Sequence, residues 1–257
     1  MTVTKRLIPI NAGYYSTDAG AALGVLPRAI WEKRISVDDL HRQKVRINLL
    51  LIQYEDRLIL IDSGIGNKLI DKKKKIYNYA DFLLPASLQE VGFSRFDITD
   101  VILTHLHFDH AGGIISIFND TPELTFPNAR HWVQNSEWHI AKSPDELNAA
   151  AYNYDENLAL LEQSSKLKLI EGNYKLTDDI ELIKVGGHTV GFQIVKFTFK
   201  DDKAIFAGDI IPTREHLPLP IISAYDISRK DTFYAKKMIL ESDSRIYFSH
   251  DIDVWSI

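Results

Sequence analysis

The stretch THLHFDHAGG, residues 104–113, places three of the chain's nine histidines within six positions, with an aspartate between the second and the third. Imidazole groups are costly to bury without partners, so this density points to a function. The pattern HxHxDH is expected about once in a thousand random chains of this composition. It directly follows the apolar run DVILT, residues 100–104, which predicts a buried strand. At the end of such a strand, alternate side chains can converge on one point.

Histidine and aspartate at this spacing predict metal ligands. His105 and His107 can face one metal, while Asp109 and His110 can face a second. Imidazole and carboxylate groups suit Zn²⁺, and also iron or manganese. The chain contains no cysteine, which excludes disulfides and thiolate ligands. Four side chains cannot complete two metal sites, so further ligands are expected at other strand ends. The candidates are His188 in GGHTVG, Asp209 in FAGDI and His250 in YFSHD.

Short apolar runs rich in β-branched residues predict strands along most of the chain. Two pairs of these strands are alike. In residues 45–64, two strands are joined by the turn EDR and followed by DSG. In residues 192–209, two strands are joined by the turn KDDK and followed by AGD. Each pair ends on an acid beside a glycine, which indicates a duplicated architecture. The predicted strands are VRINLLLIQY, RLILIDSG, DVILTH, IELIKV, FQIVKFTF, KAIFAGD and RIYFSH.

Two stretches between these strands predict helices. Residues 143–163 begin with Ser143, Pro144 and Glu146, which together form a capping-box pattern. Apolar residues then recur at helical spacing, which favours core packing. Residues 228–242, SRKDTFYAKKMILES, predict the last helix of the chain.

The composition favours a soluble globular protein with a single domain over residues 1–257. No apolar run approaches the roughly 18 residues of a membrane span, and the N-terminal MTVTKRLIPIN has no apolar signal core. Together with the lack of cysteine, this predicts a cytoplasmic location without a membrane partner. The net charge is −5, and the one basic run, DKKKKIY at 71–77, is interpreted as a solvated loop. Nucleic acid is therefore not expected as a partner.

The order of these motifs resembles the metallo-β-lactamase superfamily, in its broad hydrolase branch. The resemblance runs from about residue 45 to residue 251, and its motifs specify the superfamily and the fold far better than the substrate. The motifs that carry it are DSG at 62–64, THLHFDH at 104–110, GHT at 187–189, GD at 208–209 and SH at 249–250.

The resemblance implies an α/β fold, the four-layer αββα sandwich, with a binuclear metal site on one edge. It implies one metal on His105, His107 and His188, and a second on Asp109, His110 and His250. Asp209 would bridge the two metals, and Asp62 would hold a ligand histidine by a hydrogen bond. Zinc is the favoured metal, with iron, manganese or cobalt as alternatives.

The function expected from this site is a binuclear metal-dependent hydrolase. A metal-bridging hydroxide would attack a small hydrophobic lactone or ester, and Asp109 would orient it and carry a proton to the leaving group. Residues 13–31 and 212–225 are expected to wall an apolar pocket, because they are rich in Tyr, Leu, Ile, Pro and Trp and poor in cations. Its candidate substrate-binding residues are Tyr14, Leu26, Trp31, His216 and Tyr225, with Arg214 as a further candidate.

Several functions remain as alternatives at this point. A phosphotriester hydrolase, a glyoxalase II-like thioesterase and an iron-dependent oxidoreductase all use this scaffold. The tyrosine that follows the bridging aspartate in the best-known acyl-homoserine lactonases is replaced here by Ile210. A nucleic-acid processing enzyme and a non-catalytic binding module are less favoured, because the chain is acidic and its ligand set is complete. A homodimer is compatible with the sequence.

Overall fold

The computed structural model describes residues 5–199 and 202–257. Residues 1–4, at the start of the N-terminal segment, and residues 200–201, in the expected 200–203 turn, lie outside this description. The chain divides into two compact units. Unit 1 comprises Met1–Gly13, Ile47–Ile70 and Asp81–Gly172, and unit 2 comprises Tyr14–Arg46, Asp71–Ala80 and Asn173–Ile257. The single domain over residues 1–257 stays a prediction.

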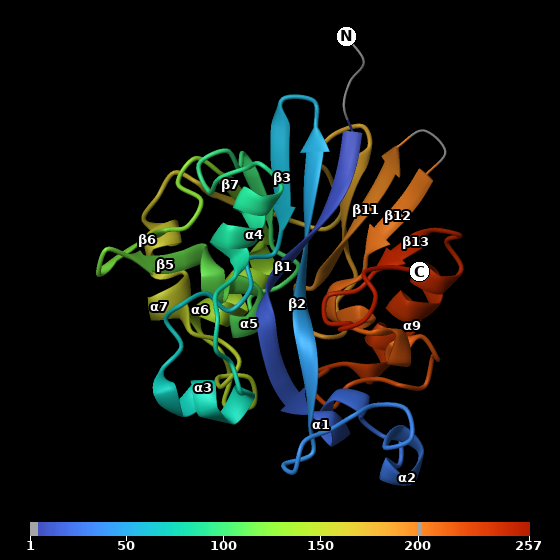
Figure 1. Cartoon of the computed structure of the whole chain (residues 1–257). Helices are drawn as coiled ribbons and strands as arrows, with labels where there is room; N and C mark the ends of the chain where they lie inside the picture. Colours follow the sequence, from blue (N-terminus) through green and yellow to red (C-terminus); the bar gives the residue numbers. More distant parts are fainter. Residues whose placement is uncertain (1–4, 200–201) are drawn as a thin grey trace. The chain divides into compact units, whose positions relative to one another are not determined.

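A mixed six-stranded sheet, in the order β1-β2-β3-β4-β7-β8, runs through the described part of unit 1 (Figure 1). Its strands β1 and β2 continue along the chain into unit 2. β2 and β3 form an antiparallel hairpin, and β3, β4, β7 and β8 then pair in parallel. The strands are β1 (Lys5–Asp18), β2 (Arg42–Tyr54), β3 (Arg57–Ile61), β4 (Asp100–Ile102), β7 (Arg130–Gln134) and β8 (Leu167–Ile170), and a separate small sheet pairs β5 (Ile115–Phe118) with β6 (Thr121–Leu124).

Short helices accompany this sheet in unit 1. The longest of them, α6, packs beside β7 and β8. The helices of unit 1 are α4 (Leu84–Glu90), α5 (Phe108–Ala111), η1 (Gly112–Ile114), α6 (Asn135–Lys142), α7 (Tyr154–Asn157) and α8 (Ala159–Glu162).

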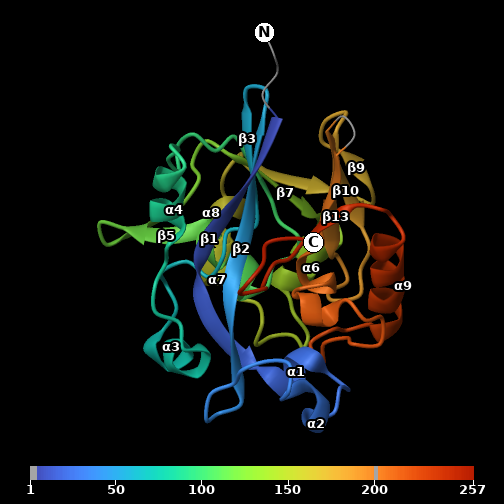
Figure 2. The ribbon, with the colours of Figure 1, turned by 45° about the vertical axis from the view of Figure 1, so that its right-hand side comes forward.

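Unit 2 contains a five-stranded sheet in the order β13-β12-β11-β10-β9, counted over the residues that the structure describes. The helix α9 lies beside this sheet (Figure 2). The strands are β9 (Tyr174–Lys175), β10 (Ile180–Lys184), β11 (Gln193–Phe199), β12 (Asp202–Phe206) and β13 (Arg245–Tyr247), and the helices are α1 (Ala19–Leu23), α2 (Arg28–Trp31), α3 (Asp71–Tyr77), η2 (Gly208–Ile210), η3 (Arg214–His216) and α9 (Arg229–Leu240).

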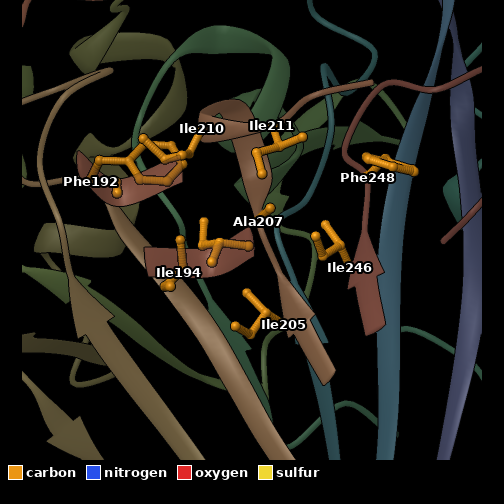
Figure 3. Packing of buried hydrophobic residues seen from close by; sticks show 10 residues of the cluster. Phe192, Ile194, Ile205, Ala207, Ile210, Ile211, Ile246 and Phe248 are labelled. Atoms are coloured by element: carbon orange, nitrogen blue, oxygen red, sulfur yellow. The ribbon is translucent and has the colours of Figure 1, made fainter. Parts of the chain in front are cut away.

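The core of unit 2 joins α9 to its sheet. Ala235 and Ile239, four residues apart on α9, are buried against side chains from β11, β12 and β13. Their spacing places both on one face of the helix. Figure 3 shows the sheet side of this cluster: Phe192, Ile194, Ile205, Ala207, Ile210, Ile211, Ile246 and Phe248. This packing anchors the loops that follow β12 and β13.

The two similar sequence stretches adopt the same local topology. In unit 1 the β2–β3 hairpin is followed by β4, which pairs in parallel with β3. In unit 2 the β11–β12 hairpin is followed by β13, which pairs in parallel with β12. Asp62 follows β3 directly, and Asp209 lies just after β12. Each unit therefore places an acidic residue at the C-terminal end of the second hairpin strand, where α/β proteins tend to bind ligands.

Every strand predicted from the sequence is present, and so is the helix predicted over 228–242, as α9. The helix predicted over 143–163 is wrong in its first half. Residues 143–153 form turns, and only α7 and α8 are helical. The Asp145 carboxylate accepts a hydrogen bond from the Asn148 N–H, which stabilises a local turn instead. The Ala151 carbonyl accepts from the Phe108 N–H, so this backbone is held away from the helical path.

Two further points differ from the sequence-based expectations. The basic run 71–77, interpreted as a loop, forms the helix α3, although its residues are not buried. The strands β1 and β5 to β9 were not predicted from the sequence. Among the described residues, no helix is both long enough and apolar enough to cross a membrane.

Buried His131 predicts a fold that loses stability in acid. This side chain on β7 is 0% exposed, and burial lowers its pKa from 6.5 to about 4. The unfolded chain binds a proton more readily than the folded chain, so the stabilisation is complete above pH 6.5 and is lost as the pH falls towards 4. The loss is about 3 kcal/mol for this residue. The measurement is urea unfolding of metal-free protein at pH 7 and pH 4. His131→Leu should reduce the difference in the free energy of unfolding between these two pH values by that amount.

The matched control is His139→Leu, since His139 is exposed on α6. It should leave the pH dependence of unfolding unchanged. An equal effect of both substitutions would show that burial of His131 is not the cause.

Candidate metal centre

The histidine cluster forms the loop after β4 and the first turn of α5. The ring centroids of His105 and His107 lie 4.5 Å apart, and those of His105 and His110 lie 4.1 Å apart. The Asp109 carboxylate lies 3.8 Å from His110 Nε2. These four side chains therefore converge within unit 1, as the sequence predicts for a strand-end loop.

Asp62 supports this cluster from the end of β3. It is fully buried, and its Oδ2 accepts a hydrogen bond from His110 Nδ1 at 2.9 Å. Its Oδ1 accepts from the Thr104 N–H at 2.8 Å, and the Thr104 hydroxyl donates to the same carboxylate. Asp62 has a φ of +62°, a left-handed conformation that is rare outside glycine but tolerated by aspartate. The hydrogen bonds to His110 and Thr104 offset the cost of this backbone and of the buried charge.

Thr104 links Asp62 to a second histidine. Because its hydroxyl hydrogen is donated to Asp62, the oxygen is left to accept from His105 Nδ1, 3.1 Å away. One buried carboxylate thus orients two imidazole rings, one directly and one through a hydroxyl group.

Glu137 on α6 supports the other side of the cluster. It is fully buried, and it accepts hydrogen bonds from the Leu106 N–H and the Tyr152 hydroxyl, both at 3.0 Å. The Tyr152 ring packs edge-on against His107 at 4.9 Å. The non-helical path of residues 143–153 therefore has a consequence, because it brings Tyr152 to the histidine cluster.

Residues 63–68, which follow Asp62, contact the backbone of residues 110–115 at the C-terminal end of the histidine cluster. The Ser63 N–H donates to the His110 carbonyl, and Lys68 Nζ donates to the carbonyls of Gly112 and Ile115. Burial lowers the pKa of Lys68 to about 8. At Gly66, an added Cβ would lie 2.7 Å from the Gly112 carbonyl oxygen, so only glycine permits this approach.

In unit 2, the candidate ligands His188 and His250 lie on either side of the third candidate, Asp209. His250 Nε2 lies 3.3 Å from Asp209 Oδ1, and His188 Nε2 lies 3.5 Å from Asp209 Oδ2. The Ser249 hydroxyl donates to Asp209 Oδ1 at 2.8 Å. Each oxygen of this carboxylate therefore faces a different histidine.

Asp226, which the sequence analysis missed, is a hydrogen-bonding partner of a candidate ligand. It lies in the loop before α9, and its Oδ1 accepts from His188 Nδ1 at 2.7 Å. The side chains of both residues are buried. No motif surrounds Asp226, and 38 positions separate it from His188, so no signal in the sequence identifies the pair.

The donor set fits divalent metal ions. Nδ1 of His105, His110 and His188 donates to the oxygen atoms of Thr104, Asp62 and Asp226 as described, and His250 Nδ1 donates to the Arg46 carbonyl at 3.2 Å. A neutral imidazole with its proton on Nδ1 presents the Nε2 lone pair as a ligand. Metal-binding histidines in proteins are nearly always held in this way. The ring nitrogens that face Asp109 and Asp209 are thus prepared to bind metal rather than to donate a proton.

A cavity lies beside the ligands of unit 2. It contains about 440 Å³ of empty space, part of it open to solvent. Among the described residues that line it, none is a lysine or an arginine. Three of them are the ligand candidates His188, Asp209 and His250, and the others are Tyr15, Thr17, Ala22, Gln43, Val45, Pro212, Thr213, His216, Ser223 and Tyr225.

Two of the five predicted substrate-binding residues line this cavity, namely His216 and Tyr225. Tyr14, Leu26 and Trp31 are not among its lining residues. Leu26 and Trp31 pack in a cluster with Ala19 and Leu23. A role of these three residues in substrate binding stays a prediction.

His216 contributes to the wall of the cavity with both ring nitrogens engaged. Nε2 donates to the Ala22 carbonyl at 2.9 Å, and Nδ1 accepts from the Thr213 hydroxyl at 2.8 Å. Burial lowers the pKa of His216 to about 4, so the ring is neutral. Arg214 forms ion pairs with Asp251 and Asp253 and does not line the cavity.

Comparisons with known proteins agree on one family. The family model described as the metallo-beta-lactamase superfamily matches residues 43–250. An N-acyl homoserine lactonase from Bacillus sp is 25% identical over 219 residues, which cover 79% of this chain and 80% of the lactonase.

Two solved structures extend the comparison to the fold. A probable metal-dependent hydrolase from Staphylococcus aureus has a TM-score of 0.91 and 27% identity, covering 100% of this chain and 93% of that protein. AidC, a dizinc quorum-quenching lactonase in complex with a product, has a TM-score of 0.77 and 22% identity, covering 99% of this chain and 92% of AidC.

The Asp226–His188 pair predicts that Asp226→Ala weakens metal binding without removing a ligand. His188 would lose the acceptor that fixes its ring and its tautomer, which typically lowers metal affinity by about 10–100-fold. Titration of the metal-free protein with Zn²⁺ against a competing chelator measures this change. Asp39→Ala, which removes an exposed carboxylate from unit 2, is the matched control. Equal zinc affinity in the two variants would contradict the role of Asp226.

Proposed function

The chain belongs to the metallo-β-lactamase superfamily, and from that premise we propose a binuclear metallohydrolase that opens a small hydrophobic lactone. The observation that carries the proposal is the cavity of unit 2. Its wall contains three ligand candidates, and none of the described residues that line it is a lysine or an arginine. A neutral substrate seated there would lie beside the metal-binding side chains.

The coarser expectations from the sequence are confirmed. The resemblance to the superfamily is correct, and so is the fold class, α/β with the αββα sandwich of the metallo-β-lactamase type. The protein is a metal-dependent hydrolase.

The proposed metal sites are those implied by the sequence. One metal ion would be held by His105, His107 and His188, the other by Asp109, His110 and His250, and Asp209 would be shared by both. The support is the orientation of the imidazole rings in each unit and the dizinc centre named for AidC. We propose zinc for both sites, with iron, manganese or cobalt as alternatives.

Two bound divalent cations supply a nucleophile from water near neutral pH and polarise the substrate's carbonyl oxygen. The protein's own groups then do the remaining work. Asp226 and the Arg46 carbonyl fix His188 and His250 through Nδ1, so that both rings present Nε2 towards the oxygens of Asp209. Asp109, a residue that is 8% exposed and lies beside His110, can accept a proton and return it to the leaving oxygen of the opened ring.

The choice of a lactone rests on two findings. The cavity wall combines apolar groups from Ala22, Val45 and Pro212 with a few hydroxyl and amide groups, as small-molecule sites usually do. The relatives in the sequence comparison are N-acyl homoserine lactonases. A polyanion such as RNA, or a glutathione thioester, would call for the lysine or arginine side chains that this wall lacks among its described residues. The cytoplasmic location and the homodimer stay predictions.

The first prediction from this proposal is metal content. The seven proposed ligands exceed the four of a tetrahedral zinc site, so elemental analysis of metal-saturated protein should give about two metal ions per chain. Oxygen consumption should be absent, which separates hydrolysis from iron-dependent oxidation. One equivalent of metal with all seven ligands intact would exclude the binuclear site.

A second prediction concerns the bridging carboxylate. Asp209→Ala should lower the metal content and the turnover together by more than the roughly 10–100-fold expected for the loss of a hydrogen-bonding partner. Two cations would lie close together without their shared negative charge. Elemental analysis and initial rates, compared with His250→Ala, measure both effects. If Asp209→Ala retains both metals and a near-normal rate, the residue does not bridge.

The third prediction is the order of substrates. The kcat/KM of metal-loaded protein should be highest for a long-chain acyl lactone, lower for an aryl phosphotriester and lowest for a glutathione thioester or a short RNA. A tenfold difference corresponds to about 1.4 kcal/mol of transition-state stabilisation. A thioester or RNA preferred over the lactone by about tenfold would overturn the substrate assignment.

A further inference from the structure

Gln43 is a polar residue in an apolar position. On β2 the side chains of Gln43, Val45 and Ile47 are buried, whereas Lys44, between the first two, is exposed. This alternation places Gln43 on the inward face of the strand. An antiparallel bridge between Val37 and Gln43 fixes the backbone at this position.

The Gln43 side chain lies at the wall of the cavity and has no hydrogen-bonding partner among the described residues. The residue is only 9% exposed and lines the cavity beside His188 and Asp209. Within residues 5–199 and 202–257, its side chain makes no hydrogen bond with another residue. The amide is not sealed off from the cavity, so a molecule bound there can supply the hydrogen bonds that the protein does not.

The chemistry of this group defines the partner. A carboxamide offers one carbonyl acceptor and one NH₂ donor side by side. A secondary amide in the substrate presents the complementary N–H and C=O, so it can satisfy both groups of Gln43. An ester of the same shape has acceptors only and leaves the Gln43 carbonyl unpaired.

We propose that Gln43 is a specificity-determining residue that binds a secondary amide next to the scissile lactone ring. This inference rests on the proposed lactonase function. Val45 and Ala22, which line the same cavity, provide apolar contacts for the acyl chain attached to that amide. A site built to hydrogen-bond a substrate N–H discriminates strongly against an analogue that lacks it.

The test compares two matched lactones on the metal-loaded full chain. N-hexanoyl homoserine lactone carries the amide, and α-hexanoyloxy-γ-butyrolactone replaces its N–H with an oxygen. We expect the wild-type kcat/KM to favour the amide by at least about tenfold. In Gln43→Leu the two values should lie within about threefold of each other, because KM for the amide lactone rises while the constants for the ester change little.

Two controls separate recognition from folding. Gln43→Leu removes an amide that makes no hydrogen bond to another described residue, so its melting temperature should equal or exceed that of the wild type. Lys44→Met, on the exposed side of the same strand, should keep the wild-type preference for the amide. If Gln43→Leu does not fold, Gln43→Met, which is closer in shape, takes its place.

The outcomes are distinguishable. If the wild type opens neither lactone, the proposed function is wrong and the inference falls with it. If it opens both lactones at equal rates, or if the preference persists in Gln43→Leu, the lactonase function stands and the role of Gln43 is overturned.

Discussion

The hydrogen bonds that hold Nδ1 of the histidines are the constraint on which the candidate metal centre depends. In His110, His188 and His250 these bonds make Nδ1 the protonated nitrogen and turn Nε2 towards a carboxylate. The acceptors differ, since His110 and His188 use the buried carboxylates Asp62 and Asp226, while His250 uses a backbone carbonyl. The common result is an imidazole that is ready to bind a metal without rearranging.

Buried charge is what makes this arrangement costly. Asp62 is fully buried, and Asp226 has a side chain that is almost fully buried. An ionised carboxylate in such a position is stable only when it is hydrogen-bonded or paired. Asp62 meets this requirement with the Thr104 amide, the Thr104 hydroxyl and His110. Its left-handed backbone conformation is therefore stabilised by contacts that also orient two ligands.

The polar side chains in the wall of the unit 2 cavity are held mainly by neutral hydrogen bonds. Most of its polar wall groups are engaged within the protein, as with His216 between Ala22 and Thr213 and with the Ser223 hydroxyl on Ala21. These bonds fix the positions of the His216 and Ser223 side chains in the wall. Lys236 supports it from α9 by donating to the carbonyls of Pro218 and Ile221, and burial lowers its pKa to about 8. A cavity without lysine or arginine among its described lining residues favours an uncharged ligand.

The sequence by itself determined the features that depend on neighbouring residues. The HxHxDH cluster, the strand-end positions of His188, Asp209 and His250, and the hairpins each follow from a local pattern, because strand alternation and turn chemistry act over a few residues. The tertiary structure decided which groups serve these side chains. Asp226, Thr104 and Glu137 were assigned only when the chain was folded, since a buried side chain takes whichever partner the fold brings near. The same reason explains the helix wrongly predicted over 143–163. Its capping signal was local, but the Ala151 carbonyl bonds to Phe108, 43 positions earlier, and that distant hydrogen bond outweighed the helical pattern.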